Sequence, residues 1–375
     1  MSGSPRSAAT DDRLQRRALE AFLAEQVPEL RPHLPIIDVE RLGQGQSNVT
    51  LRLVLGGGKR AILRRPPPGP LPPSAHDVLR EHRVMRALAA SAVPVPRMLA
   101  VCEDPAVLGA PFFIMEALEG DAIRFQMPPS LEEGVPLAWR RSIGEQVVGA
   151  LAALHTTDPA AVGLADLGRP SGYLARQLKR WTGQLDFARV RPVDDLDLVT
   201  GWLHANLPAE HETVQGRIVH GDYKLDNVLF SHTRPPKLLA VVDWEMATLG
   251  DPLADLGWLL AFWRQAGDPS PELRIVPRVT EAPGFSTREE LAARYAQRTG
   301  RALPAHLRFY VVLALWKMAV LLEGHWARHV QGTATAGGFD FGYLEAAGPA
   351  FWARIRREAE GDGSLATGDN GRERG

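Results

Sequence analysis

The spacing of hydrophobic residues changes along the chain, from short apolar runs to a helical repeat. In the N-terminal third, apolar residues are grouped or alternate with polar ones, as is typical of β-strands. Strands are predicted at residues 36–43, 48–55, 59–65, 98–102 and 111–118. The triplet Gly56-Gly57-Gly58 predicts a hairpin between the second and third strands. The five strands indicate a small sheet-based lobe.

Helical spacing dominates after Gly120. Two helices are predicted earlier, at 14–22 and 77–90, and six more at 138–155, 171–185, 195–206, 253–264, 287–298 and 305–330. Ser286 and Glu289 form a capping-box pattern at the start of the helix at 287–298. Strand-rich segments at 217–230 and 237–244 interrupt the helices. The pattern predicts an α+β protein with a small five-stranded N-terminal lobe and a larger, mostly helical C-terminal lobe.

This change of pattern also predicts the domain limits. They are an N-terminal tail and helix at 1–30, a β-rich lobe at 31–118, a helical lobe at 119–360 and a tail at 361–375. Residues 1–10 and 361–375 are polar and aperiodic, so we expect loose tails. The longest apolar run, 311–322, contains Lys317 and is too short to cross ~30 Å of hydrocarbon. We therefore expect a buried helix there, and neither a membrane span nor a secretory signal.

Composition narrows the classes of partner. The 43 Lys and Arg residues balance 44 Asp and Glu residues, which argues against a general binder of nucleic acid or anionic membranes. The single cysteine, Cys102, excludes an internal disulfide and a cysteine-based zinc site, so a reducing cytoplasmic location is expected. Only five lysines occur, at 59, 179, 224, 237 and 317, and a lysine inside a motif is therefore notable.

The segment IVHGDYKLDNVLF, at 218–230, concentrates polar residues between apolar flanks, as a loop in a cleft would. Asp222 suits the acceptance of a hydroxyl proton, and the side-chain oxygen of Asn227 suits a hard cation. Lys224 suits neutralisation of a phosphoryl group, and Asp243, at the end of an apolar strand, suits Mg²⁺. For each single residue, an Asx-type turn cap is the structural alternative.

The N-terminal lobe holds a second set of candidates. The segment LGQGQSN, at 42–48, supplies Gly43, Gly45, Ser47 and Asn48 as phosphate-binding groups, although a plain hairpin turn fits equally well. Glu81 lies on the apolar face of its predicted helix, where a carboxylate needs a cationic partner. Arg64, at the end of a strand, is the expected partner; the alternative is a solvated Glu81 at the edge of the face.

Three polar residues of the helical lobe are interpreted as structural. Asp251 precedes Pro252 and is a plausible helix N-cap. Asp255, one turn later, is expected to brace the preceding loop. His155 lies on an apolar face at a helix end, which is typical of a core histidine.

HGDYKLDN, followed by a strand that ends in Asp243-Trp244, resembles the aminoglycoside phosphotransferase and choline kinase family. The resemblance covers about residues 35–330 and implies a two-lobed, protein-kinase-like fold. The RRPPPGP segment, at 64–70, and the helix after it are similar to one branch, the kinase-like domains joined to acyl-CoA dehydrogenases.

The resemblance implies specific roles. Asp222 matches the catalytic base, Asn227 and Asp243 match the magnesium ligands, and His220 matches a structural histidine. Glu81 matches the glutamate that orients the phosphate-binding cation, and Arg64 stands where most kinases have lysine. A hinge at Met115–Leu118, with Glu116 and Leu118, would bind adenine through backbone groups. The implied cofactors are ATP and Mg²⁺.

The leading hypothesis is transfer of the γ-phosphoryl group of ATP to a hydroxyl of a small molecule, such as a hydroxy acid or hydroxyacyl compound. The first alternative is an antibiotic kinase. Six acidic and six basic residues at 160–210 offer no surplus of negative charge for a polycationic aminoglycoside. The second alternative is a nucleotide-binding pseudokinase, supported by Arg64 alone. The pattern does not indicate an oligomeric state.

Overall fold

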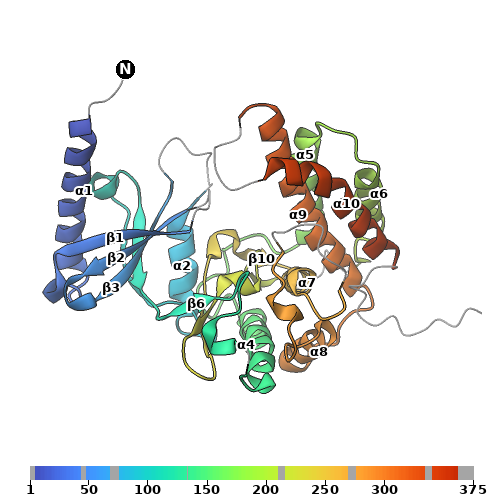
Figure 1. Cartoon of the computed structure of the whole chain (residues 1–375), viewed down its shortest axis with the longest axis horizontal. Coiled ribbons are helices and arrows are strands. Elements are labelled where there is room, and N and C mark those ends of the chain that lie inside the picture. Colours follow the sequence, from blue (N-terminus) through green and yellow to red (C-terminus); the bar gives the residue numbers. More distant parts are fainter. Residues whose placement is uncertain are drawn as a thin grey trace, which may run out of the picture. The chain divides into compact units, whose positions relative to one another are not determined.

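The computed structural model describes residues 5–43, 48–67, 76–132, 134–209, 216–268, 276–333 and 340–361 (Figure 1). The chain forms two compact units. The first comprises Met1–Ala90, Pro94–Glu119 and Val242–Glu245, and the second comprises Ser91–Val93, Gly120–Val241 and Met246–Gly375. A four-residue segment from late in the chain therefore belongs to the first unit.

The first unit contains a five-stranded antiparallel sheet, in agreement with the sequence prediction. Its order is β1-β2-β3-β5-β4. The strands are β1 (Ile36–Leu42), β2 (Val49–Leu55), β3 (Arg60–Arg65), β4 (Met98–Cys102) and β5 (Phe112–Glu116). A single 3-10 turn, Gly56–Gly58, joins β2 to β3. Gly57 has a φ of 68° in that turn, a conformation that favours glycine.

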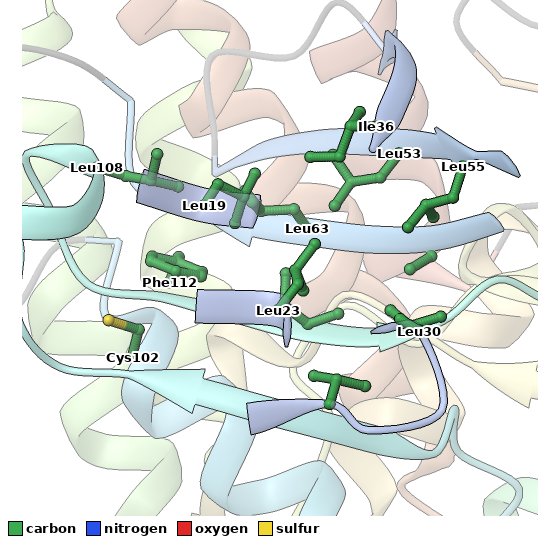
Figure 2. Packing of buried hydrophobic residues seen from close by; sticks show 13 residues of the cluster. Leu19, Leu23, Leu30, Ile36, Leu53, Leu55, Leu63, Cys102, Leu108 and Phe112 are labelled. Atoms are coloured by element: carbon green, nitrogen blue, oxygen red, sulfur yellow. The ribbon is translucent and has the colours of Figure 1, made fainter. Parts of the chain in front are cut away.

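Helix α1 (Pro5–Gln26) packs against one face of this sheet. Figure 2 shows Leu19 and Leu23 of the helix beside Leu63 and Phe112 of the sheet. The helix is longer than the predicted 14–22, and it begins inside the segment expected to be a loose tail. Although the sequence grouped this helix with the tail, its apolar residues belong to the core of the sheet.

Helix α2 (Val78–Leu88) lies against β4 and β5. Side chains of successive strand residues point to opposite faces of a sheet. Leu63 packs in the α1 cluster, so Arg64 points to the other face. The ring of His82, on α2, is 5.9 Å from that of Phe113, the strand partner of Arg64. Arg64 and α2 are therefore on the same face.

The second unit is mostly helical and contains α4 (Leu137–Thr156), α5 (Tyr173–Ala188), α6 (Asp194–Ala205), α7 (Leu253–Phe262), α8 (Arg288–Thr299), α9 (Leu307–Val330) and α10 (Phe341–Glu360). Helix α9 contacts α7, α10 and α5 (Figure 1), and its segment 311–322 is the buried helix expected from the sequence. In the described part of the chain, no helix is both long and apolar enough to cross a membrane.

Some elements differ from the prediction. Helix α10 was not predicted because Gly342, Gly348 and Pro349 interrupt its apolar pattern. A short helix, α3 (Pro105–Leu108), was also missed. The capping box of α8 is formed by Thr287 and Glu290 rather than by Ser286 and Glu289, because the helix begins one residue later than expected.

Two small sheets of the second unit hold the polar loop. One has the order β6-β8-β9 and the other pairs β10 with β7. The strands are β6 (Gly120–Ala122), β7 (Arg217–Val219), β8 (Val228–Ser231), β9 (Leu238–Val241) and β10 (Thr248–Gly250). The loop at 220–227 connects a strand of one sheet to a strand of the other, so both of its ends are fixed.

Candidate active site

Asp222 lies at the centre of a polar group in the second unit. Lys224 Nζ is 3.1 Å from both carboxylate oxygens. Asn227 Nδ2 donates to Oδ2 and to the backbone oxygen of Asp222, at 2.9 Å in both cases. The side chain of Asp222 keeps 24% of its surface exposed. The carboxylate is thus held in place and still accessible from solvent.

Asp255, on α7, holds the start of this loop. Its Oδ2 accepts the backbone N–H of His220 at 2.6 Å, and its Oδ1 accepts that of Gly221 at 2.8 Å. His155 Nε2 lies 3.3 Å from Oδ2. Burial raises the pKa of Asp255, but the hydrogen bond and charge of His155 and the contacts with His220 outweigh it, so the pKa is lowered overall. The expected bracing by Asp255 is confirmed.

His155 has the structural position expected from the sequence, whereas the N-cap of α7 is Pro252, one residue after the predicted Asp251. His155 is buried, and its Nδ1 lies 2.8 Å from the hydroxyl of Tyr295. Asp251 accepts the backbone N–H of Leu253 at 3.0 Å and the hydroxyl of Tyr310 at 2.7 Å. Both residues are core polar groups with hydrogen-bond partners.

Gly221 is required by the backbone of the loop. Its φ is 86°, and a Cβ atom added there would lie 2.8 Å from both Cβ and O of Met246. A side chain would therefore be strained by the backbone and obstructed by a neighbour. The glycine of HGD serves the close approach of the loop to residue 246.

Arg64 is the centre of the polar group in the first unit. Its Nε donates to Glu81 Oε2 at 2.6 Å, and its Nη2 donates to Asp243 Oδ1 at 2.5 Å. Its Nη1 donates to Thr50 Oγ1 at 2.9 Å. The ion pair predicted between Arg64 and Glu81 is confirmed. The contacts with Thr50 and Asp243 were not predicted.

Glu81 is 1% exposed and is the most strongly perturbed carboxylate of this group. Burial raises its pKa to about 7, because the charge of Arg64 only partly offsets the loss of water. The nearby Asp243 and Glu245 raise the pKa further. Asn48 Nδ2 donates to Glu81 Oε2 at 3.4 Å. Among the described residues, the buried Oδ1 of Asn48 has no hydrogen-bond partner.

Asp243 has a φ of 69°, in the left-handed region that non-glycine residues rarely adopt. Its side chain is 32% exposed. A strained backbone conformation persists only where surrounding contacts impose it, and such residues are frequent at functional sites. The bond from Arg64 to Oδ1 is one such contact.

The remaining predicted residues are spread over the first unit. Gly43 is exposed and has a φ of 75°, whereas Gly45 and Ser47 lie outside the described residues. Glu116 ends β5, and its backbone N–H donates to the oxygen of Arg97 at 3.0 Å. Leu118 is half-buried beyond the strand. An adenine contact at 115–118 would need backbone groups other than the N–H of Glu116.

The second unit contains a pocket of about 540 Å³, including the part open to solvent. Lys224, Leu225 and Asp226 line it together with mostly apolar residues of three further segments, namely Leu259, Phe262, Trp263, Pro277, Val279, Thr280 and Met318. Burial raises the pKa of Asp226, against the opposing charge of Lys224. The pocket was not predicted, because its apolar residues resemble those of an ordinary hydrophobic core.

Comparison with known proteins identifies the family. The family model described as the phosphotransferase enzyme family (APH) matches residues 38–310. The chain belongs to this family. The matched range lies within the 35–330 predicted from the motifs, so the resemblance is confirmed.

One relative of this phosphotransferase is the rat acyl-CoA dehydrogenase family member 11, 35% identical over 323 residues. The match covers 84% of this chain and 40% of the relative, so the chain spans less than half the length of that protein. A solved structure from Ralstonia eutropha, provisionally assigned as an aminoglycoside phosphotransferase, is 34% identical with a TM-score of 0.75. That match covers 92% of this chain and 98% of the other.

The fold is also that of choline kinase. The enzyme from Cryptosporidium parvum superposes with a TM-score of 0.60, over 92% of this phosphotransferase and 96% of the other chain, at 12% identity. At that identity the match shows the fold alone. The protein-kinase-like fold predicted from the sequence is confirmed.

Asn227 and Asp243, the expected magnesium ligands, carry side-chain oxygen atoms of the kind that Mg²⁺ binds. Among the described residues, no group of three or more His, Cys, Asp and Glu side chains forms a metal cluster. Mg²⁺ is commonly held by one or two carboxylates together with waters and substrate phosphates, so a cluster of that kind is not required. The nitrogen of the Asn227 amide is used by Asp222, which leaves its Oδ1 as the atom for a cation. The oxygen donors of Asn227 and Asp243 therefore fit the ion.

Proposed function

We propose that this phosphotransferase transfers the γ-phosphoryl group of ATP to a hydroxyl group of a small molecule. The observation that carries the proposal is the carboxylate of Asp222, which is held by Lys224 and Asn227 and remains open to solvent. A base for a hydroxyl acceptor needs both properties, because it must be oriented and must also be reached by the acceptor.

Asp222 would accept a hydrogen bond from the acceptor hydroxyl and take its proton during transfer. Asn227 Nδ2 fixes Oδ2, so the hydroxyl would approach the other carboxylate oxygen. The ammonium group of Lys224 lies 3.1 Å from the carboxylate and adds a positive charge to the site. The same charge would counter the negative charge of the transferred group.

Arg64 would bind the phosphates of ATP in the first unit. A guanidinium has five N–H donors, and three are used by Glu81, Asp243 and Thr50. Two N–H groups remain for phosphate oxygens. Arginine thus keeps three anchoring contacts and still offers donors, which supports the catalytic hypothesis over the pseudokinase hypothesis. Gly43, Gly45, Ser47 and Asn48 would add donors, and backbone groups at 115–118 would bind adenine.

Asn227 Oδ1 and the carboxylate of Asp243 would each offer an oxygen to Mg²⁺. When bound, the ion supplies charge neutralisation to the phosphate oxygens. The strained backbone at Asp243 supports a functional role for this residue rather than a structural one.

A hydroxy acid or hydroxyacyl compound is the acceptor that we favour. The pocket beside Lys224 is lined mainly by apolar side chains, which suits an acyl portion. The name of the rat relative, an acyl-CoA dehydrogenase family member, supports the same class. An aminoglycoside is the second candidate, supported by the assignment of the Ralstonia eutropha protein. The balanced charge of residues 160–210 counts against it.

The test is phosphoryl transfer from ATP or GTP to a panel of hydroxy acids, hydroxyacyl-CoA esters and aminoglycosides, with the Asp222→Asn variant in parallel. We expect Asp222→Asn to lower turnover by about 10²-fold or more while nucleotide binding is retained. The Asp186→Asn variant is the control, because it changes an exposed carboxylate of the same unit that does not line the pocket. Near-normal turnover in Asp222→Asn would refute the assignment, and absence of transfer to every acceptor would favour the pseudokinase.

A further inference from the structure

Lys317, on α9, is a buried cation that the chemistry proposed above does not use. Its side chain is in the second unit and is 8% exposed. Within the described chain, its ammonium group makes neither a hydrogen bond nor an ion pair with a carboxylate. A charge removed from water is costly unless a counter-charge or polar group compensates it. Among the described residues, this buried ammonium group therefore lacks an anionic partner.

Two tryptophans hold the ammonium group in position. Nζ of Lys317 lies 4.8 Å from the ring centroid of Trp258 and 5.4 Å from that of Trp181. Cation–π contacts of this kind favour the charged form without providing a hydrogen-bond acceptor. The buried Nε1 of Trp258 also has no acceptor among the described residues. Two neighbouring donor groups, the charged ammonium and the neutral indole N–H, are therefore left unpaired among the described residues.

The charges around Lys317 connect it to the candidate active site. Burial lowers its pKa to about 8, and the carboxylates of Asp255 and Asp222 partly oppose that effect. Arg180 lowers the pKa slightly further. The ammonium form still predominates near neutral pH. Its interaction with Asp222 means that the ammonium group is within electrostatic range of the proposed base.

The helix positions next to this contact line the acceptor pocket. Met318 follows Lys317 on α9, and Leu259 follows Trp258 on α7; both line the pocket. The ring of Phe262, another lining residue, is 5.0 Å from that of Trp258. A molecule in the pocket therefore contacts the same helices that carry the unpaired donors.

We propose that Lys317 and Trp258 form a subsite for a carboxylate group of the acceptor. A carboxylate has two oxygens, which matches the two unpaired donors. The same ammonium would repel a cationic acceptor, so the subsite would also select against positively charged alcohols. The proposal rests on the proposed function and adds to it the charge class of the acceptor.

The test compares three four-carbon probes that share a secondary alcohol: 3-hydroxybutyrate, 1,3-butanediol and 4-amino-2-butanol. Binding to the full chain is measured by ligand-observed NMR, without nucleotide, so the result does not depend on catalysis. Lys317→Met preserves apolar volume, and Lys317→Arg preserves charge. Lys179→Met is the matched control, because Lys179 is an exposed lysine of the same unit.

We expect wild-type protein to bind the carboxylate probe most tightly. Lys317→Met should weaken that binding about tenfold, the value of one charged hydrogen bond, and leave the diol unchanged. Lys317→Arg and Lys179→Met should keep the preference. Equal binding of the three probes, no binding of 3-hydroxybutyrate at millimolar concentration, or an unchanged affinity in Lys317→Met would overturn the subsite.

Phosphoryl transfer to 1,3-butanediol, measured in parallel, separates the two proposals. Transfer to the diol together with an unchanged carboxylate affinity in Lys317→Met overturns the subsite and leaves the proposed function standing. Loss of carboxylate affinity in that variant, with no transfer to any probe, supports the subsite and counts against the proposed function.

Discussion

Replacement of Arg64 by methionine measures how much the buried ion pair stabilises the first unit. The change keeps an aliphatic side chain and removes the guanidinium, so Glu81 loses the cation 2.6 Å away. Because Glu81 is 1% exposed, water cannot replace the lost partner. Loss of one partner of a buried pair costs ~3–5 kcal/mol, and we expect the free energy of unfolding to fall by that amount near neutral pH.

The loss of unfolding free energy in Arg64→Met, called the deficit below, should depend on pH. Burial already raises the pKa of Glu81 from 4.5 to about 7, which corresponds to about 3 kcal/mol. A carboxyl group with a higher pKa in the folded protein stabilises the fold at low pH, and this contribution is lost as pH rises through the folded pKa. Without Arg64 that pKa rises further. The deficit of Arg64→Met should therefore be larger at about pH 8 than at about pH 5.

Unfolding in urea is monitored locally, by amide hydrogen exchange in β3 and α2. A local probe is needed because a protein of two units is not expected to unfold in a single global transition. Arg52→Met is the matched control, because Arg52 forms an exposed pair with Glu40 at 3.0 Å on the same sheet. That pair should contribute less than ~1 kcal/mol. The double variant Arg64→Met/Glu81→Gln should be more stable than Arg64→Met alone at about pH 8. An equal deficit at both pH values, or no rescue by Glu81→Gln, would refute the reasoning.

Three further outcomes are expected. Asp243→Ala should abolish transfer and weaken the Mg²⁺ dependence of nucleotide binding. Asn227→Ala should weaken both less, because a neutral ligand contributes less charge. A titration with Mg²⁺ at fixed ATP concentration checks both variants. Asp255→Asn should lower turnover at least tenfold, since the amide nitrogen that replaces one carboxylate oxygen cannot accept an N–H, and one of the two loop N–H groups loses its acceptor. Faster hydrogen exchange at 220–222 would report the loosened loop. Gly221→Ala should cost ~1–3 kcal/mol, measured by thermal unfolding, because its φ is 86° and its Cβ would meet Met246.

The elements that were predicted correctly are those in which apolar residues recur with a clear helical or strand spacing. The strands of the first unit and helices such as α4 and α9 have such a period. Helix α10 does not, because Gly342, Gly348 and Pro349 weaken its local preference. It is held by packing instead, since its buried residues lie against α9 and α6. Tertiary contacts of this kind leave no local pattern in the sequence.

In the candidate site, too, contacts within a short motif could be predicted, and contacts between distant parts of the chain could not. Asp222, Lys224 and Asn227 lie within six residues, so the motif itself predicts their proximity. The contact between Arg64 and Asp243 joins residues 179 positions apart, and only the fold brings them together. Thr50 was more accessible to prediction, because the hairpin register pairs it directly with Arg64. From the sequence, Lys317 is a rare lysine within an apolar run. Its contacts with Trp181 and Trp258 could not be predicted, because these residues lie on two other helices.

The segment Val242–Glu245 has a consequence for how the protein is made. It belongs to the first unit, but it is synthesised more than a hundred residues after Glu119, where the rest of that unit ends. A nascent chain that has just completed the sheet has Arg64 and Glu81, and it lacks the carboxylate that takes the second charged contact of the guanidinium. During synthesis the first unit is therefore incomplete until Val242–Glu245 has been made. Neither unit is one uninterrupted stretch of the sequence, so neither can be expressed complete as a single continuous segment.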